Sequence, residues 1–435
     1  MKHRWLLIAF VLLTVALASN SAGRAATTSA SGHIMRVSVA SDGAQANGDV
    51  TRSGFSADGR VVAFVSDATN LTAEPIIAGH SYLYAFDRAT RQTTLLPLTS
   101  PGTPVDLATV AHDLAVSGDG RFVAFDTYTA IAAGDSNGHS DIYVHDRLTG
   151  QTTRVSVSSD GTQNNGFSVA PRLSYNGRFV VFASEGNSLV PGYSGSGTFI
   201  HDRQTGITEA VTVATDGSSA NMGGGGGSIS DDGRFVAFLS ISTNLDDNAV
   251  PEKSNVFIRD RQTGETSWLW ASPAYVHINF MDMSGDGRYL AIGTESNCYY
   301  DICDDVIHLY DRQAGQVIGH LDNAYAGSGS YQIIATAGPV VAILSDAPLI
   351  AADTDNSADV YRHDFATGVT TLVTDPQFGP SVWFDTPSHV AISADGRDIV
   401  FRSEGPYFVP DDTNEASDLF VWTMATDFVY LPVIR

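Results

Sequence analysis

Basic residues are scarce in this sequence of 435 residues, and charged residues of any kind are few. There are 24 Lys and Arg against 48 Asp and Glu, which gives a formal net charge of −24 at pH 7. Only 17% of the residues are charged, whereas globular proteins average about 25%. A surface this acidic repels phosphate backbones and anionic lipid, so we expect no nucleic-acid partner. The same surface attracts cations.

Long hydrophobic runs are also missing, with one exception at the N-terminus. A basic start at residues 2–4 precedes an apolar stretch at 5–18 that is too short for a comfortable membrane span. The stretch ends in Ala-Leu-Ala, a small-x-small pattern that predicts cleavage near Ala18. We therefore expect residues 1–18 to be a secretory signal peptide and residues 19–33 a short linker. The mature chain should be secreted or periplasmic, with no membrane span.

Cysteine is nearly absent. Cys298 and Cys303, in the segment NCYYDIC, are the two that the sequence holds. In an oxidising compartment, two thiols this close in sequence are expected to form a local disulfide. The sequence has no CxxC motif, which argues against a thioredoxin-type redox role.

Catalytic motifs are missing as well. The sequence contains neither a G-x-S-x-G nucleophile elbow nor an HExxH zinc motif. A glycosidase needs two carboxylates at a fixed separation, and no pair among the 48 acids stands out by its pattern. The sequence therefore gives no positive evidence for an enzyme.

Glycine, by contrast, is abundant, and many of the 41 glycines belong to an internal repeat. The repeated unit begins with a Ser-x-Asp-Gly-Arg turn and an apolar strand. Its copies are SADGRVVAFVS (56–66), SGDGRFVAFDT (117–127), SYNGRFVVFAS (174–184), SDDGRFVAFLS (230–240), SGDGRYLAIGT (284–294), the divergent ATAGPVVAILS (335–345) and SADGRDIVFRS (393–403).

A second pattern, Asp-Arg-x-Thr-Gly, follows three copies after a loop, as in IYVHDRLTGQT, and three further copies carry it with one substitution. Each unit then holds four short strands, a to d, in which Gly supplies the positive φ of the tight turns. Strand b is apolar at successive positions, so both of its faces need cover. Seven units arranged radially provide it, whereas an open stack would leave two apolar sheets exposed. We predict an all-β, seven-bladed β-propeller over residues 34–425.

The ring also shows how it closes. RVSVASDGAQANG (36–48) matches RVSVSSDGTQNNG (154–166), which spans strand d and the loop after it. We therefore expect residues 36–39 to pair with the strand at 419–423 and complete the last blade. The C-terminal tail, residues 426–435, competes for the same place.

These repeats resemble the WD40-like (PD40) propeller repeats of the TolB type. The resemblance rests on S-x-D-G-R-x-[VL]-A-[FI] followed by D-R-x-T-G, and it covers nearly the whole mature chain. It implies an exported protein that acts as a binding platform. The chain has no counterpart of the separate N-terminal α/β domain of TolB, so a Tol–Pal role is not carried over.

The topology sorts the connections onto two faces. The a–b and c–d turns share one face, which we call the regular face, and the b–c and d–a loops share the other, the variable face. The DGR arginines and the Asp residues that end strand c, such as Asp146 and Asp260, recur in six blades. We interpret these as turn caps and inter-blade pairs, because a catalytic group is seldom needed six times. Function should reside on the variable face.

Three b–c loops carry oxygen ligands at positions one, three and seven. We call them the acid loops. Alternating Asp and Asn oxygens suit a hard cation such as Ca²⁺, although the same residues also cap turns. The candidate ligands are Asp135, Asn137 and Asp141 in blade 2, Asp353, Asp355 and Asp359 in blade 6, and Asp412, Asn414 and Asp418 in blade 7.

The innermost strands hold a second candidate site. Charged residues there are hydrated only if they reach the central channel, and they differ from blade to blade as a binding site would. They could equally form a ring of ion pairs that lines a water-filled channel. The residues are Arg52, Asp113, Arg172, Asp282 and His389.

Together these patterns favour an exported, monomeric, non-catalytic binding module. Its ligand, a protein or a polysaccharide, would bind the variable face and the central channel, with calcium as a candidate stabilising ion. The alternative is a metal-dependent enzyme of polysaccharide lyase, glycosidase or lactonase type with its site in the channel. Some propellers that resemble this one are metal-dependent polysaccharide lyases.

Overall fold

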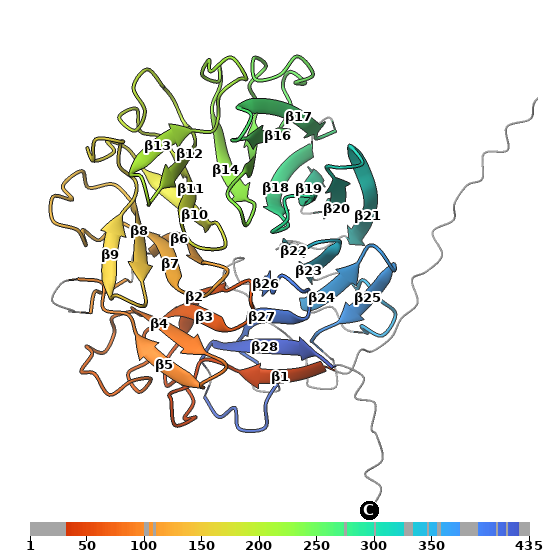
Figure 1. The fold of residues 1–435 in the computed structure, drawn as a ribbon. Helices are drawn as coiled ribbons and strands as arrows, with labels where there is room; N and C mark the ends of the chain where they lie inside the picture. Colours follow the sequence, from red (N-terminus) through yellow and green to blue (C-terminus); the bar gives the residue numbers. More distant parts are fainter. Residues whose placement is uncertain are drawn as a thin grey trace, which may run out of the picture.

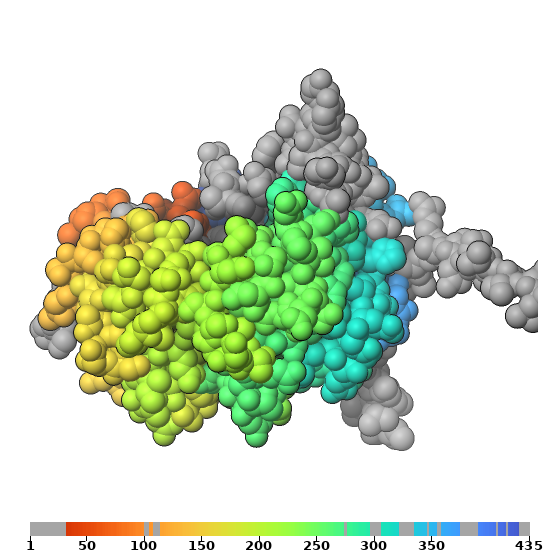
Figure 2. All heavy atoms as spheres, turned by 90° about the horizontal axis from the view of Figure 1, so that it is seen from above, coloured from red at the N-terminus to blue at the C-terminus, as the bar shows by residue number. Residues whose placement is uncertain are grey.

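The computed structural model describes residues 32–99, 104–107, 110–273, 276–299, 302–325, 334–345, 348–354, 358–374, 390–405, 408–414 and 416–425. Seven four-stranded antiparallel sheets surround a central axis, as predicted (Figure 1). Strands a to d of each blade run from the axis outward. Figure 2 views the disc from its rim, where blades 3 to 5 lie (yellow-green to teal). In the part of the chain described here, no helix is long and apolar enough to cross a membrane.

The strands of the first four blades are short, with four to seven residues each. Blade 1 contains β2 (Val50–Phe55), β3 (Val61–Ser66), β4 (Tyr82–Asp87) and β5 (Gln92–Leu95). Blade 2 contains β6 (Val110–Val116), β7 (Phe122–Thr127), β8 (Asp141–Asp146) and β9 (Gln151–Arg154). Blade 3 contains β10 (Ser168–Leu173), β11 (Phe179–Ser184), β12 (Gly197–Asp202) and β13 (Ile207–Ala210). Blade 4 contains β14 (Gly224–Ile229), β15 (Phe235–Ser240), β16 (Asn255–Asp260) and β17 (Glu265–Ala271).

Blade 5 has the longest strands, and blade 7 is built from both ends of the chain. Blade 5 contains β18 (Val276–Met283), β19 (Tyr289–Tyr299), β20 (Ile302–Asp311) and β21 (Gln316–Tyr325). Blade 6 contains β22 (Ile334–Ala337), β23 (Val340–Ser345), β24 (Asp359–Asp364) and β25 (Val369–Leu372). Blade 7 contains β26 (Val390–Ile392), β27 (Asp398–Ser403), β28 (Asp418–Met424) and, as its outer strand, β1 (Gly32–Arg36).

The N-terminal strand closes the ring, but it lies earlier in the sequence than predicted. β1 pairs antiparallel with β28, with Arg36 opposite Phe420, so the strand ends where the predicted one begins. Beyond it, Val37 N still donates to Leu419 O at 2.8 Å. The match between residues 36–48 and 154–166 aligned equivalent residues, because β9 ends at Arg154 as β1 ends at Arg36. Most of the matched segment, however, is the loop that follows strand d and not the strand itself. β1 also extends two residues into the predicted linker, and the tail at 426–435 lies outside the described residues.

The cores form between blades, from strands buried on both faces. Strand b is fully buried in blades 1, 2 and 6, as its continuous apolar sequence predicts. Cross-strand aromatic pairs join strands b and c in five blades, with ring centroids 5.5–6.1 Å apart. The pairs are Phe64–Tyr84, Phe125–Tyr143, Phe182–Phe199, Phe238–Phe257 and Phe401–Phe420.

The Ser-x-Asp-Gly-Arg signature is a self-capped turn. In blade 1, Ser56 Oγ donates to Asp58 Oδ1 at 2.5 Å and accepts from Val61 N at 2.8 Å. Asp58 also accepts from Arg60 N at 2.9 Å, and Gly59 has a φ of +72° that favours glycine. The divergent blade 6 replaces this turn with two residues, Gly338 and Pro339, between Ala337 and Val340.

The repeated Arg and Asp residues are structural, as predicted. The predicted ion pairs between blades are not formed by the DGR arginines of blades 1 to 5, because each of these binds the Asp that ends strand c of its own blade. In blade 2, Arg121 binds Asp146 through Nε at 2.9 Å and Nη2 at 2.7 Å, which lowers the pKa of Asp146 to about 2. The contact between blades comes instead from the next Asp-Arg turn. Arg203 of blade 3 lies over the ring of Phe122 in blade 2, 4.1 Å from its centroid.

Three buried histidines share one position on strand c. They are His145, His201 and His363. His201 Nδ1 lies 2.8 Å from Thr208 Oγ1, whose hydroxyl donates to Val157 O. The Thr hydroxyl therefore accepts from Nδ1–H, which fixes a neutral tautomer. Burial lowers the pKa of each of the three imidazoles to about 4.

We expect His201→Phe to reduce the loss of stability in acid. The unfolded imidazole gains its proton near pH 6.5 and the folded one near pH 4, so this histidine destabilises the fold as the pH falls between those values. Blade 1 carries Phe86 at the same position, buried beside Thr93, so the replacement should fit. Relative to the parent, the variant should gain about 2.5 kcal/mol between pH 7 and pH 4.5 in urea unfolding. Between pH 7 and 8.5 the difference should stay constant, and a constant difference down to pH 4.5 would refute the assignment.

Candidate functional site

The acid loop of blade 2 brings its two aspartates together, as predicted, but around protein donors. Gln163 Nε2 donates to Asp135 Oδ1 at 2.9 Å and to Asp141 Oδ2 at 3.1 Å. Arg154 Nη1 lies 3.5 Å from Asp135 and 3.7 Å from Asp141. Asn137 Nδ2 donates to Asp141 at 3.1 Å, so it faces the carboxylate with its amide hydrogens. Burial raises the pKa of Asp141 despite these donors.

Blade 7 repeats this arrangement with residues from the N-terminus. Gln45 Nε2 donates to Asp412 Oδ1 at 2.7 Å and to Asp418 Oδ2 at 2.8 Å. The Arg36 guanidinium lies 3.8 Å from Asp412 and 3.7 Å from Asp418. Asn414 Nδ2 donates to Ala46 O at 2.7 Å, so this amide also points its hydrogens at an acceptor. The pKa of Asp418 is raised to about 6, chiefly by burial.

The residues of blades 2 and 7 do not fit a calcium ion in this arrangement. Ca²⁺ takes six to eight oxygen ligands at about 2.3–2.6 Å. Between each pair of aspartates lies the NH₂ group of a glutamine, with a guanidinium beside it. An ion would have to displace the amide and approach a positive charge. The acid loops of blades 2 and 7 are therefore charge-compensated clusters.

Blade 6 differs at the position of the arginine. Leu372 ends β25, where Arg154 ends β9. Asp353 and Asp359 are both buried; Tyr361 donates to Asp353, and Thr374 Oγ1 donates to Asp359 at 2.5 Å. The predicted third ligand, Asp355, lies outside the described residues. Among the residues that the structure describes, no group of three or more His, Cys, Asp or Glu is placed to hold a metal.

The central channel contains a hydrogen-bonded link between neighbouring blades. Asp282 on β18 accepts from Ser228 Oγ of blade 4 at 3.0 Å and from Thr336 N of blade 6 at 2.9 Å. Burial raises the pKa of Asp282, and the positive charge of Arg172 opposes that shift. Both residues line a hollow of about 150 Å³. These contacts favour a structural role for Asp282 and Arg172 over a role in ligand binding.

The other predicted channel residues are placed less fully. Arg52 lies on β2, and its Nη1 donates to Thr51 O at 2.8 Å. Asp113 lies on β6, but its side chain is not among those described, and His389 lies outside the described residues. Cys298 and Cys303 lie on β19 and β20, which pair across Tyr299 and Ile302. The cysteine side chains also lie outside the described part, so the disulfide stays a prediction.

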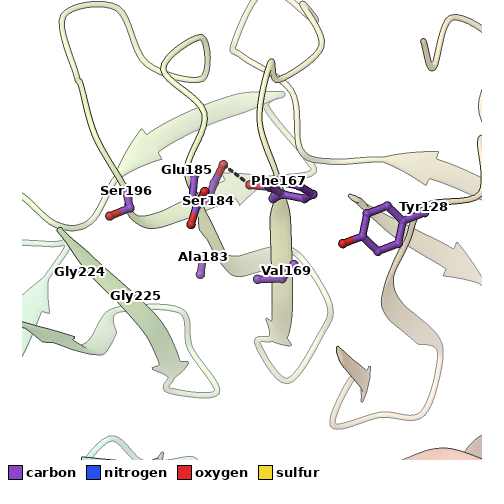
Figure 3. A pocket seen from close by; sticks show the side chains of 9 residues that line it. All are labelled: Tyr128, Phe167, Val169, Ala183, Ser184, Glu185, Ser196, Gly224 and Gly225. Carbon is purple, nitrogen blue, oxygen red and sulfur yellow. Dashed lines mark hydrogen bonds between the residues drawn. The ribbon is translucent and has the colours of Figure 1, made fainter. Parts of the chain in front are cut away.

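A hollow that no sequence pattern above predicted lies on the variable face, among the residues that the structure describes. We call it the blade 2–4 cleft, and its volume is about 450 Å³. Figure 3 shows Ser196 and the backbone of Gly224 and Gly225 on one side and Tyr128 on the other. The lining residues are Tyr128, Phe167, Val169, Ala183, Ser184, Glu185, Ser196, Gly224 and Gly225.

Exposed aromatic rings form one wall of the cleft. Tyr128 is 47% exposed and Phe167 is 37% exposed, and their rings meet edge to face at 6.1 Å. His139 also packs edge to face against Phe167, with ring centroids 4.5 Å apart. Ser184 Oγ donates to Phe167 O at 2.9 Å, which holds this backbone in place. Large exposed rings beside a hollow are typical of ligand sites.

A sequence signal for the cleft was available in aligned positions. Tyr128 follows the last residue of strand b in blade 2, and Glu185 and Ile241 hold the same position in blades 3 and 4. A repeated position whose residue changes from aromatic to acid to aliphatic is under no common structural requirement. The run of five glycines at 223–227 is a second signal.

Comparison with known proteins shows the fold alone. The chain matches no protein-family model and no curated protein sequence. An oligogalacturonate lyase in complex with manganese is similar in structure, with 13% identity, a TM-score of 0.56, and 92% of this chain and 95% of that chain covered. The propeller domain of the Trilobed protease from Pyrococcus furiosus gives 13% identity and a TM-score of 0.53 over 89% and 99%.

A more distant likeness is to TolB from Acinetobacter baumannii. It has 17% identity and a TM-score of 0.40, and it covers 65% of this chain. The chain spans 56% of the length of that TolB protein. The protein is a seven-bladed β-propeller, and its fold is similar to that of propellers as different as a lyase and a protease domain.

Proposed function

We propose that this protein is an exported, non-catalytic binding module built from WD40-like repeats of the TolB type. Its ligand binds the variable face, at the blade 2–4 cleft and beside the mouth of the central channel. The observation that carries the proposal is the cleft itself, with two exposed aromatic rings over a hollow of about 450 Å³. Pockets of about 300–1,000 Å³ with apolar and aromatic walls and a few polar groups are typical of small-molecule sites.

The regular face provides the contrast that supports this choice. Its Arg and Asp side chains are occupied in bidentate pairs in blades 1 to 5, as with Arg178 and Asp202 at 2.9 and 2.7 Å. The same groups recur in five blades, so they serve the fold rather than one ligand. On the variable face the residues differ from blade to blade, which a specific partner requires.

The test is capture of native material by the immobilised full-length mature protein. Extract from the cell envelope and medium of the source organism is passed over the parent protein and over the double variant Tyr128→Ser, Phe167→Ser. We expect the double variant to lose the captured proteins or glycans, because the two exposed aromatic rings on the wall of the cleft are gone. Tyr175→Ser is the matched control, since Tyr175 is 39% exposed on a turn of the regular face.

The same experiment addresses catalysis. Captured material eluted after prolonged incubation should have the chain length of the input, because a binding module releases its ligand unchanged. Shortened glycans or newly formed unsaturated ends would support the enzyme alternative. Equal capture by the parent and the double variant would refute the proposed face.

A further inference from the structure

Gly225, on the wall of the cleft, differs from the glycines beside it because the fold does not require a glycine at this position. Glycine within a strand is destabilising by about 0.5–1 kcal/mol relative to alanine, so each one needs a reason. A Cβ on Gly224 would lie 2.8 Å from Leu239 O, and one on Gly227 would lie 2.8 Å from Val181 Cγ1. These two glycines are required by close packing.

Gly226 and Gly225 differ from them. Gly226 has a φ of +65° at a bulge in β14, a conformation that favours glycine. Gly225 is not among the positive-φ glycines, and a Cβ built on it meets nothing within 4 Å. The same position in blade 3 is Val169, which also lines the cleft. A side chain at Gly225 is therefore allowed by the fold and would only fill the cleft, as expected where a ligand lies close to the backbone.

The charge of the cleft restricts the ligand. Its described lining residues include Glu185, which is exposed, and neither Lys nor Arg. The chain as a whole carries a formal charge of −24. A ligand rich in carboxylate or phosphate would be repelled and would find no cationic partner there.

The backbone beside the cleft restricts it further. An extended peptide binds most readily by adding a strand to a free sheet edge. The inner strands at the cleft have interrupted edges: the register of β10 shifts between Val169 and Arg172, and that of β14 shifts between Gly225 and Gly227. Ala170 also has a positive φ of 56°. A bulged edge cannot continue the ladder, so a peptide strand is disfavoured.

We infer that the blade 2–4 cleft binds a short neutral saccharide, for which Gly225 keeps the space open. This inference rests on the proposed function and specifies its ligand. A sugar ring has an apolar C–H face that can lie on Tyr128 or Phe167. Its hydroxyl groups can donate to the Glu185 carboxylate and exchange hydrogen bonds with Ser196.

The experiment is calorimetric titration of the mature protein with four probes of similar size. Two are neutral, cellotriose and triacetylchitotriose; one is anionic, tri-galacturonate; and one is cationic, tri-lysine. We expect at least one neutral trisaccharide to bind. We expect tri-galacturonate and tri-lysine to bind no more tightly than that neutral trisaccharide.

Gly225→Val is the decisive variant. It should weaken binding of the neutral trisaccharide by at least about tenfold, because the side chain enters the cleft. Its thermal midpoint should be unchanged or raised, since valine is favoured in strands and the fold leaves room for it. Tyr175→Ser should bind like the parent.

Three outcomes overturn the inference: no binding by either neutral trisaccharide, tighter binding of tri-galacturonate or tri-lysine, or unchanged affinity in a folded Gly225→Val variant. Should Gly225→Val fail to fold, Tyr128→Ser serves as the second variant and must weaken binding by a similar factor. If the saccharides fail while envelope material is still captured through Tyr128 and Phe167, the binding module stands and only its ligand class is wrong.

Discussion

Deleting residues 19–40 should lower the thermal unfolding midpoint by at least about 5 °C and broaden the transition. The deletion removes β1, the outer strand of blade 7, and with it five register pairs to β28. It also removes Arg36, the cation beside Asp412 and Asp418, which are almost fully buried. A free apolar edge and two uncompensated carboxylates would remain in the blade that joins the two ends of the chain.

A shorter deletion is the matched control. Removing residues 19–31 leaves β1 and Arg36 in place, so the midpoint should match that of the parent. Differential scanning calorimetry of both deletions at neutral pH is the measurement. If the 19–40 deletion melts with the parent, the N-terminal strand does not close the ring and the pairing with β28 is of no energetic consequence.

The fold was predictable because its information is repeated. A single Ser-x-Asp-Gly-Arg segment is only a turn, but six copies and a divergent seventh unit, at intervals of one blade, define the number of sheets. Each self-capped turn also defines where strand a ends and strand b begins. The error at β1 has the same origin: the match between 36–48 and 154–166 identified equivalent segments but not the residue at which the strand stops. Strand ends depend on which backbone pairs form, and a loop with strong identity can mask them.

Blade 6 shows how sequence alignment fails where a repeat diverges. Aligned by sequence, Ile334 takes the position that precedes the turn serine in other blades. Because the turn at Gly338 and Pro339 has only two residues, the structural alignment of strand a is shifted by two residues from the sequence alignment. Thr336 therefore takes the position before the turn, opposite Val341. Its backbone N then reaches Asp282, a contact that the sequence could not indicate because it joins two blades.

The acid loops were located correctly and interpreted incompletely. The spacing of Asp135 and Asp141 predicts clustered carboxylates, and they are clustered. The spacing does not reveal the groups that compensate these carboxylates, Arg154 and Gln163. Both follow strand c in sequence and reach the acid loop only when strand d folds back beside strand c. A signal was present, because arginine ends strand d in blades 2 and 7 alone, the two blades whose acid loops contain Asn at the third position.

The cleft could not be predicted from any one repeat. Its walls come from three blades, and its main property is a missing side chain at Gly225. Periodicity identifies what the blades share, and a binding site is what they do not share. The useful comparison is therefore between equivalent positions, such as Val169 and Gly225, rather than along the chain.

Arg154→Leu should destabilise the protein by about 3–5 kcal/mol at neutral pH, measured by urea unfolding. The substitution copies Leu372 of blade 6 and preserves the apolar stem, but it leaves Asp135 and Asp141 without the guanidinium 3.5 and 3.7 Å away. The pKa of Asp141 is already raised by burial, and loss of the cation should raise it further.

The pH dependence tests the cause. A carboxyl whose pKa is higher in the folded state than in the unfolded state is stabilised by protonation, so the deficit of Arg154→Leu should shrink as the pH falls from 7 toward 4. Adding Asp135→Asn to Arg154→Leu should recover part of the loss, because one buried charge is removed. A deficit that persists at pH 4.5 and in the double variant would mean that Arg154 acts by packing alone.

The same variant examines the calcium prediction in blade 2. With the guanidinium gone, the paired carboxylates should attract a divalent cation, and Ca²⁺ should raise the thermal midpoint of Arg154→Leu in a saturable way. The parent provides the reference, because any Ca²⁺ response that it shows comes from elsewhere in the protein, for example from the acid loop of blade 6, where Leu372 replaces the arginine. An equal Ca²⁺ response in the parent and in Arg154→Leu would show that the guanidinium does not exclude a cation from this loop.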